Sequence, residues 1–98
     1  MATQQTAFLE ITLQVAAANR PAAAAVYKKY KQPFLTGAKG AQGKQLLVRD
    51  QDVQVLHTFD TVADANAYLE TDLFSRDIVK ELTPLLQRAL DIRIYQGQ

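Results

Sequence analysis

The sequence predicts a small α+β domain with the element order β-α-β-β-α-β. Three observations indicate this class. Near both ends of the chain and in its middle, apolar and polar residues alternate with period two, as they do in half-buried strands. Two segments between them carry apolar residues at the three- and four-residue spacing of helices. Only a short polar turn separates the two middle strands, which is typical of a hairpin.

The first strand is predicted at 8–15, and the first helix follows it. Asn19 is a candidate N-cap, and Pro21 lies near the first helical position, where its fixed φ suits a helix. Pro33 lacks a backbone N–H, so we expect it to end or kink this helix. One stripe of the helix is apolar and consists of Ala23, Val26, Tyr27, Tyr30 and Phe34.

The middle of the chain predicts a glycine-containing loop and then a hairpin. Gly37, Gly40 and Gly43 punctuate a loop of roughly eight residues. Strands are predicted at 45–49 and 53–59, joined by the polar turn 50–52. The second of these strands places Val53, Val55, His57 and Phe59 on one face.

A second helical region and a final strand complete the chain. Thr61 and Asp64 form a variant of the capping box, with Asp in place of Glu at the third position. Ser75 resembles a second cap, and Pro84 predicts an irregular last turn. The last strand is expected at 91–96. The apolar residues of the helical region are Ala65, Tyr68, Leu69, Leu73, Ile78, Leu82, Leu85 and Leu86.

This order is the ferredoxin-like βαββαβ arrangement, a four-stranded antiparallel sheet with the helices on one face. We expect one such domain over residues 1–98. The face toward the helices would carry Leu9, Ile11, Leu13, Val53, Val55, Phe59, Ile92 and Ile94. The other face would mix apolar, aromatic and charged residues, which suits a wet cavity or a sheet-to-sheet dimer that encloses one. Its residues would be Phe8, Glu10, Thr12, Leu47, Arg49, Gln54, Leu56, Thr58, Arg93 and Tyr95.

Composition excludes several classes of protein. The 98 residues are 48% hydrophobic and 21% charged, as in an ordinary globular domain. The absence of cysteine excludes disulfides, thiolate zinc sites and cysteine nucleophiles. Eleven basic residues against ten acidic ones are too balanced for a dedicated nucleic-acid-binding protein.

The charges are nevertheless unevenly placed along the chain. Residues 1–49 contain seven Lys or Arg residues and one acid, whereas residues 50–98 contain four and nine. Two solvated helices of opposite sign would explain this, and so would complementarity within one chain or between two chains. We expect no signal peptide, because the N-terminus has no basic region and its apolar stretch alternates with period two and contains Glu10 and Gln14. We expect no membrane partner, because no apolar run approaches the roughly 18–20 residues of a membrane span. A cytoplasmic location is the default expectation.

One local run adds a family resemblance. Phe59 to Phe74 reads Phe-Asp-Thr-Val-Ala-Asp-Ala-Asn-Ala-Tyr-Leu-Glu-Thr-Asp-Leu-Phe and leads through Leu-Thr-Pro-Leu-Leu at 82–86 to Asp-Ile-Arg-Ile-Tyr at 91–95. With the element order and length, this run resembles the antibiotic-biosynthesis-monooxygenase-like domains of the dimeric α+β barrel superfamily. The resemblance implies a homodimer whose sheets face each other and a cavity for an aromatic, quinol or polyketide-like substrate, sometimes haem. Many members place a histidine where this chain has Tyr68.

His57 and Tyr68 are the candidate catalytic residues. His57 is the only histidine, and its strand position places it toward the helices. There it would be a packed histidine, hydrogen-bonded to a tyrosine or the backbone. A role as general base or haem ligand would require a local reversal of the face, for example by a bulge.

Glu10, Arg49, Arg93 and Tyr95 are the candidate ligand-binding residues. Glu10 and Arg93 would be cross-strand neighbours, either as a structural ion pair or as an anchor for a substrate carboxylate or enolate. Lys39 and Lys44 of the glycine loop could gate a cavity or touch an anionic ligand.

The sequence therefore predicts a homodimeric cofactor-independent monooxygenase acting on an aromatic or quinol-like substrate, with no metal. The alternatives are a non-catalytic ligand-binding or dimerisation module and, less favoured, a haem-binding or haem-degrading protein.

Overall fold

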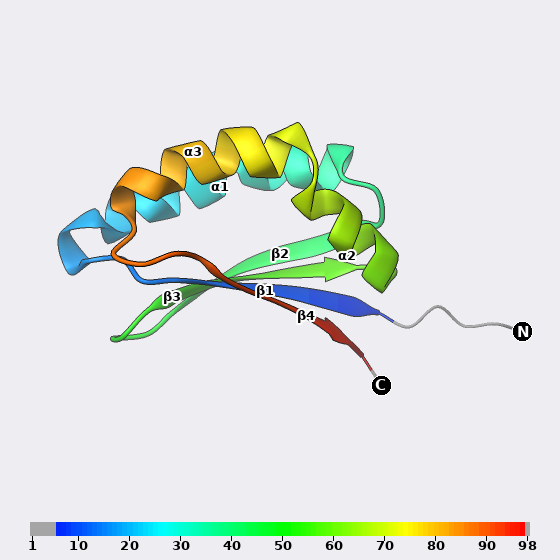
Figure 1. Ribbon diagram of the computed structural model, residues 1–98, viewed down its shortest axis with the longest axis horizontal. Coiled ribbons are helices and arrows are strands. Elements are labelled where there is room, and N and C mark those ends of the chain that lie inside the picture. Colours follow the sequence, from blue (N-terminus) through cyan, green and yellow to red (C-terminus); the bar gives the residue numbers. More distant parts are fainter. Residues whose placement is uncertain (1–5, 98) are drawn as a thin grey trace, which may run out of the picture.

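The computed structural model describes residues 6–97 and confirms the ferredoxin-like α+β fold (Figure 1). Four strands form one antiparallel sheet in the order β2-β3-β1-β4, and the helices cover one of its faces. The strands are β1 (Ala7–Leu13), β2 (Ala41–Val48), β3 (Val53–Phe59) and β4 (Asp91–Gln96). The helices are α1 (Arg20–Gly37), α2 (Val62–Leu69) and α3 (Val79–Leu82).

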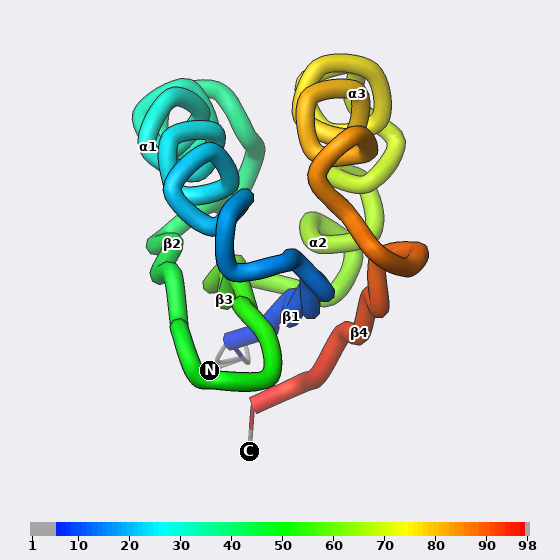
Figure 2. Tube along the Cα trace, turned by 90° about the vertical axis from the view of Figure 1, so that its left-hand side faces the viewer, coloured from blue at the N-terminus to red at the C-terminus, as the bar shows by residue number. Residues whose placement is uncertain are grey.

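Three shorter helical pieces complete the backbone. A π-helical segment, Leu73–Ile78, runs directly into α3, and turns of 3-10 helix occupy Ala17–Asn19 and Thr83–Leu85. Viewed end-on, α1 and the helix that contains α3 lie side by side above the sheet, and α2 lies closer to the strands (Figure 2).

The core lies between these helices and the sheet. Alternate residues of the two central strands are buried, and the residues between them are only partly buried. Leu9 stands between His57 on one neighbouring strand and Ile94 on the other. Phe34 of α1 and Phe59 of β3 are completely buried where helix and sheet meet. The predicted alternation, with His57 on the helix side, is therefore confirmed.

The second strand begins earlier than predicted, because the glycine segment pairs with β3. Gly40 takes a positive φ of 76°, and its carbonyl accepts a hydrogen bond from the amide of Asp60. A register shift between Ala41 and Gly43 marks a β-bulge. After this bulge Lys44 lies opposite His57, on the face toward the helices.

Three smaller predictions differ from the structure. Pro33 does not end α1, one of the two outcomes expected there, because the helix continues to Gly37 and the fully buried Phe34 anchors its last turn in the core. The first strand ends at Leu13, and beyond it Val15 makes only an isolated bridge to Leu86. Ser75 is not a helix cap.

Asp72 is the residue just before the π-helical segment, and its side chain makes no capping hydrogen bond. Thr71, one residue earlier, supplies a side-chain bond to the first turn instead. The Thr71 hydroxyl oxygen accepts a hydrogen bond from the amide of Phe74 at 3.2 Å. The Ser75 hydroxyl donates to the carbonyl of Thr71 at 2.7 Å, as side chains within a helical turn do. The predicted cap at Thr61 is confirmed, because its side chain accepts a hydrogen bond from the amide of Asp64.

Candidate functional site

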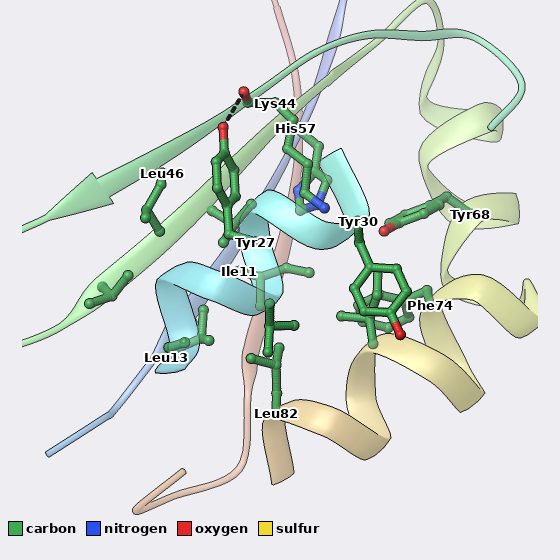
Figure 3. Close-up of a pocket in the computed structure, with 15 residues that line it drawn as sticks. Ile11, Leu13, Tyr27, Tyr30, Lys44, Leu46, His57, Tyr68, Phe74 and Leu82 are labelled. Atoms are coloured by element: carbon green, nitrogen blue, oxygen red, sulfur yellow. Dashed lines mark hydrogen bonds between the residues drawn. The ribbon is translucent and has the colours of Figure 1, made fainter. Parts of the chain in front are cut away.

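One pocket lies between the sheet and the helices, and we call it the central pocket (Figure 3). Its walls come from β1, β2, β3, α1, α2, the π-helical segment and α3. Its cavity volume is about 30 Å³, which is room for about two water molecules. Its walls are mainly apolar and include Ile11, Leu13, Leu46, Val55, Phe74 and Leu82. The central pocket thus lies on the opposite side of the sheet from the face on which the sequence analysis expected a cavity. A second hollow, at the hairpin end of β2 and β3, is lined by Leu47, Arg49 and Gln54, which the sequence analysis assigned to that face.

Aromatic rings from four elements pack together at one end of the central pocket. The ring of Phe34 lies 5.2 Å from that of His57 and 5.0 Å from that of Tyr68, both in edge-on contacts. The rings of His57 and Tyr68 are 5.5 Å apart. Phe74 of the π-helical segment lies 5.3 Å from Tyr68. These contacts hold the two predicted catalytic residues in fixed positions beside each other.

His57 is a neutral histidine in this environment. It is only 2% exposed, and its Nδ1 lies 3.0 Å from the carbonyl oxygen of Leu9. Burial is the main cause that lowers the pKa of His57, to about 4; the Leu9 carbonyl opposes this effect, and the charge of Lys44 adds to it. Because a carbonyl only accepts hydrogen bonds, we assign the proton to Nδ1, which leaves Nε2 as an acceptor.

Tyr68 brings a polar atom without a partner. Its hydroxyl is buried and has no hydrogen-bond partner among residues 6–97. Burial raises the pKa of this hydroxyl, so it remains protonated at neutral pH. A buried hydroxyl without a partner costs about 1–3 kcal/mol. A ligand oxygen that accepted this hydrogen bond would recover that free energy.

The sequence analysis placed Lys44 in the glycine loop, where it could gate a cavity or touch an anionic ligand, whereas in the structure it belongs to β2 and lines the central pocket. It lies next to His57 on the sheet side of the central pocket (Figure 3) and is 5% exposed. Burial is the main cause that lowers its pKa, to about 8, and the charge of Lys31 acts in the same direction. The hydroxyl of Tyr27 donates to the Lys44 carbonyl at 2.7 Å. This bond ties α1 to β2 at the edge of the pocket.

The four predicted ligand-binding residues do not line the central pocket. Arg49 follows the end of β2 and makes a two-pronged ion pair with Asp52, both contacts at 2.7 Å. Arg93 lies opposite Glu10 in the sheet as predicted, yet its guanidinium pairs with Asp91 at 3.1 Å. Tyr95 lies opposite Phe8 and is 48% exposed. Among these residues, only Arg93, Glu10 and Tyr95 belong to the strands of the uncovered sheet face.

Part of the uneven charge is neutralised by an ion pair between the two halves of the chain. Lys29 in the basic half pairs with Glu81 in the acidic half at 2.9 Å. The hydroxyl of Tyr30 donates to the same carboxylate. Together these contacts join α1 to α3 beside the central pocket. They also hold the pKa of Glu81 below its usual value, chiefly through the hydrogen bond from Tyr30.

Within residues 6–97, no group of three or more His, Cys, Asp or Glu side chains is placed to hold a metal ion. No helix in the same range has both the length and the apolar composition needed to cross a lipid bilayer.

Comparison with solved structures identifies the fold. "Putative antibiotic biosynthesis monooxygenase" from Bordetella bronchiseptica matches with a TM-score of 0.83 at 14% identity, over 97% of this chain and 99% of that one. The protein of the same name from Nitrosomonas europaea matches with a TM-score of 0.82 at 13% identity, over 99% and 94%. A dimeric Bacteroides fragilis protein of unknown function, with a ferredoxin-like fold, matches with a TM-score of 0.74 at 9% identity, over 93% and 95%.

These matches confirm the predicted resemblance to antibiotic-biosynthesis-monooxygenase-like domains at the level of the fold. No family model and no curated protein matches the sequence.

Proposed function

We propose that the protein binds a small aromatic or quinol-like molecule in the central pocket and oxidises it as a cofactor-independent monooxygenase. The observation that carries this proposal is a pocket of apolar and aromatic walls with a neutral histidine and an unpaired tyrosine hydroxyl. Such a pocket suits aromatic ligands, because apolar walls supply affinity and a few polar groups fix the orientation. The names of the structural neighbours support the class of reaction.

In this reaction the substrate itself supplies the electrons. A phenol that loses its proton becomes electron-rich, and molecular oxygen then reacts at a ring carbon. The ring loses one C–H hydrogen and the phenol loses its O–H hydrogen. One oxygen atom becomes the new carbonyl of a quinone, and the other leaves as water with both hydrogens.

His57 and Tyr68 would orient the substrate for this step. Nε2 of His57 accepts a hydrogen bond from the substrate hydroxyl, and the Tyr68 hydroxyl donates to a substrate oxygen. With a pKa of about 4, His57 is a weaker base than the sequence analysis assumed for a general base near pKa 7. Because a weak base removes a proton less readily, His57 favours the more acidic phenols and enols among the possible substrates.

The low basicity of His57 also favours a second candidate function. A neutral imidazole and a tyrosine hydroxyl are sufficient to bind a ligand without any proton transfer. The protein would then be a non-catalytic ligand-binding module with the same pocket. The pocket holds about two water molecules, so even a single aromatic ring enters only if the lining side chains move apart. Haem would need a far larger movement of the helices, which makes it the less favoured ligand.

We also propose that the protein is a homodimer whose subunits meet through the uncovered face of the sheet. Leu47 and Tyr95 on this face are 40% and 48% exposed, which is high for large apolar side chains. The half-buried Phe8 and Leu56 lie between them on the central strands. The description of the Bacteroides fragilis neighbour as dimeric supports this arrangement.

Oxygen uptake and ligand binding, measured side by side, test the function. We expect hydroquinone or α-naphthol to shift the NMR signals of pocket residues and to increase oxygen uptake above the rate in buffer. Tyr68→Phe removes only the unpaired hydroxyl and should weaken binding about three- to tenfold. Tyr95→Phe removes a hydroxyl outside the pocket and should leave binding unchanged.

The outcomes separate the two candidate functions. Binding without oxygen uptake for both compounds would replace the monooxygenase with the binding module. The absence of any signal shift in the pocket would overturn both.

A further inference from the structure

Lys44 is a buried lysine without a counter-charge. Its ammonium lies over the rings of Tyr27 and Phe34, 5.7 Å and 5.3 Å from their centroids. In the described part of the chain, the ion pairs all involve other residues, and the Lys44 ammonium makes no hydrogen bond. The ammonium thus rests on the faces of two rings. Contacts between a cation and a ring contribute about 0.5–2 kcal/mol each, less than it costs to bury an unpaired ammonium.

The groups around Lys44 add no negative charge at neutral pH. Helix α1 contributes Tyr27, whose hydroxyl donates its hydrogen bond to the Lys44 carbonyl, and the positively charged Lys31. From β3 comes the neutral His57, and from α2 comes Tyr68, whose hydroxyl stays protonated. Because the pKa of Lys44 is about 8, its amine is still protonated in most molecules at pH 7. The central pocket therefore has one positively charged wall among apolar ones.

An anionic aromatic ligand satisfies both features of this pocket. Its ring would pack against the apolar walls, and its charged oxygen would pair with the ammonium in a setting where charge-assisted hydrogen bonds are strong. A neutral aromatic molecule would leave the ammonium unpaired. A small inorganic anion would leave the apolar walls exposed to water.

We propose that Lys44 binds the negatively charged oxygen of an aromatic ligand, a phenolate or an enolate, and so makes the central pocket selective for acidic phenols and enols. This inference rests on the proposed function and specifies its substrate class. It also meets a need of that function. Because the ammonium stabilises the deprotonated ligand, a weak base such as His57 suffices to accept the proton.

Paired probes that differ by one methyl group test the proposal. para-Nitrophenol changes its visible absorption when it ionises, whereas para-nitroanisole has the same ring and cannot ionise. At pH 7 we expect the wild-type protein to bind the phenolate at least about tenfold more tightly than the anisole. The absorption of the bound phenol should show its pKa lowered by about one unit or more, which is the same tenfold preference.

Two lysine variants complete the test. Lys44→Met keeps an unbranched apolar side chain and should remove both the preference and the pKa shift, while anisole binding changes less than about twofold. Lys28→Met removes an exposed lysine from α1 and should leave both measurements as in the wild type. Thermal unfolding of Lys44→Met establishes that the variant folds, and we expect it to be more stable than the wild type at pH 7, because it buries no charge.

Each outcome has a distinct meaning. If both probes bind equally well to the wild type, or if Lys44→Met keeps the preference for phenolate, the role of Lys44 is overturned and the aromatic pocket stands. If neither probe binds, the proposed function itself fails.

Discussion

His57 makes the stability of the protein depend on pH. An unfolded chain binds a proton at this imidazole near pH 6.5, whereas burial delays protonation in the folded chain until about pH 4. The contribution of the neutral His57 to the free energy of unfolding is therefore fully present above pH 6.5 and is lost as the pH falls toward 4. The loss over this window is about 3 kcal/mol, since one pKa unit corresponds to about 1.4 kcal/mol.

Replacement of this residue should remove that dependence. Urea unfolding of His57→Phe at several values between pH 7 and 4 should show a flatter decline than the wild type, by about 3 kcal/mol over the window. Carboxyl groups titrate in both proteins and cancel in the difference. Val55→Ala, a core substitution without a titratable group, serves as the control and should destabilise the protein equally at each pH. Parallel curves for His57→Phe and wild type would contradict the prediction.

The two polar residues on the sheet side of the pocket differ in how far the sequence reveals them. His57 stands in an unbroken alternation, so its position toward the helices follows from strand periodicity alone. Lys44 is in regular register with Leu46 and Val48, so the same period of two places it toward the helices once the strand is extended back to it. The sequence analysis missed this because it began the strand at 45 and assigned the preceding glycine segment, which carries the bulge between Ala41 and Gly43, to a loop.

Among the elements, the entry into β2 depends on Gly40. Its φ of 76° is unfavourable for residues with a side chain, and a Cβ built there would clash with the carboxylate of Asp64. We expect Gly40→Ala to lower the free energy of unfolding by about 1–3 kcal/mol, as measured by urea or thermal unfolding.

A matched glycine provides the control. Gly37 ends α1, and a Cβ added to it would meet no atom within 4 Å, so Gly37→Ala should change stability by less than about 1 kcal/mol. The double variant Gly40→Ala/Asp64→Ala should recover the part of the loss that comes from the steric clash. Equal effects of the two single substitutions would show that the turn does not need glycine.

Element boundaries were less predictable than element types. The type and order of the strands follow from period-two alternation, and the cap at Thr61 follows from its spacing to Asp64. Pro33 has a local tendency to end a helix, which the burial of the adjacent Phe34 outweighs. Such a contact joins residues far apart in the sequence, so a local pattern does not contain it.

At the scale of the whole molecule, the side of the sheet that holds the pocket was also not predictable. The sequence divides the strand residues into two faces correctly. It does not show that the helices leave a space above the apolar face, because packing density depends on how α1, α3 and the sheet are placed together. The mixed composition of the other face suggested a cavity there, whereas it indicates a contact surface equally well.

The proposed dimer can be tested on that surface. We expect light scattering at micromolar concentration to give twice the mass of the single chain. Leu47→Glu places a charge on the uncovered sheet face and should weaken dimerisation at least about tenfold, because a buried unpaired carboxylate costs several kcal/mol. Gln32→Glu, on the exposed side of α1, introduces the same charge away from the sheet and should not change the mass. A wild-type protein that remains monomeric would overturn the dimer.

The placement of Lys44 and Tyr68 has a consequence for the product of the proposed reaction. Lys44 reaches the central pocket from β2, at the edge of the sheet beneath α1, and Tyr68 reaches it from α2, which lies toward β1 and β4 (Figure 2). One group is a cation and the other is a neutral hydrogen-bond donor. An unsymmetrical ligand that met both would bind in a single orientation. Oxygen would then be added at one ring carbon, and the reaction would give one positional isomer instead of a mixture.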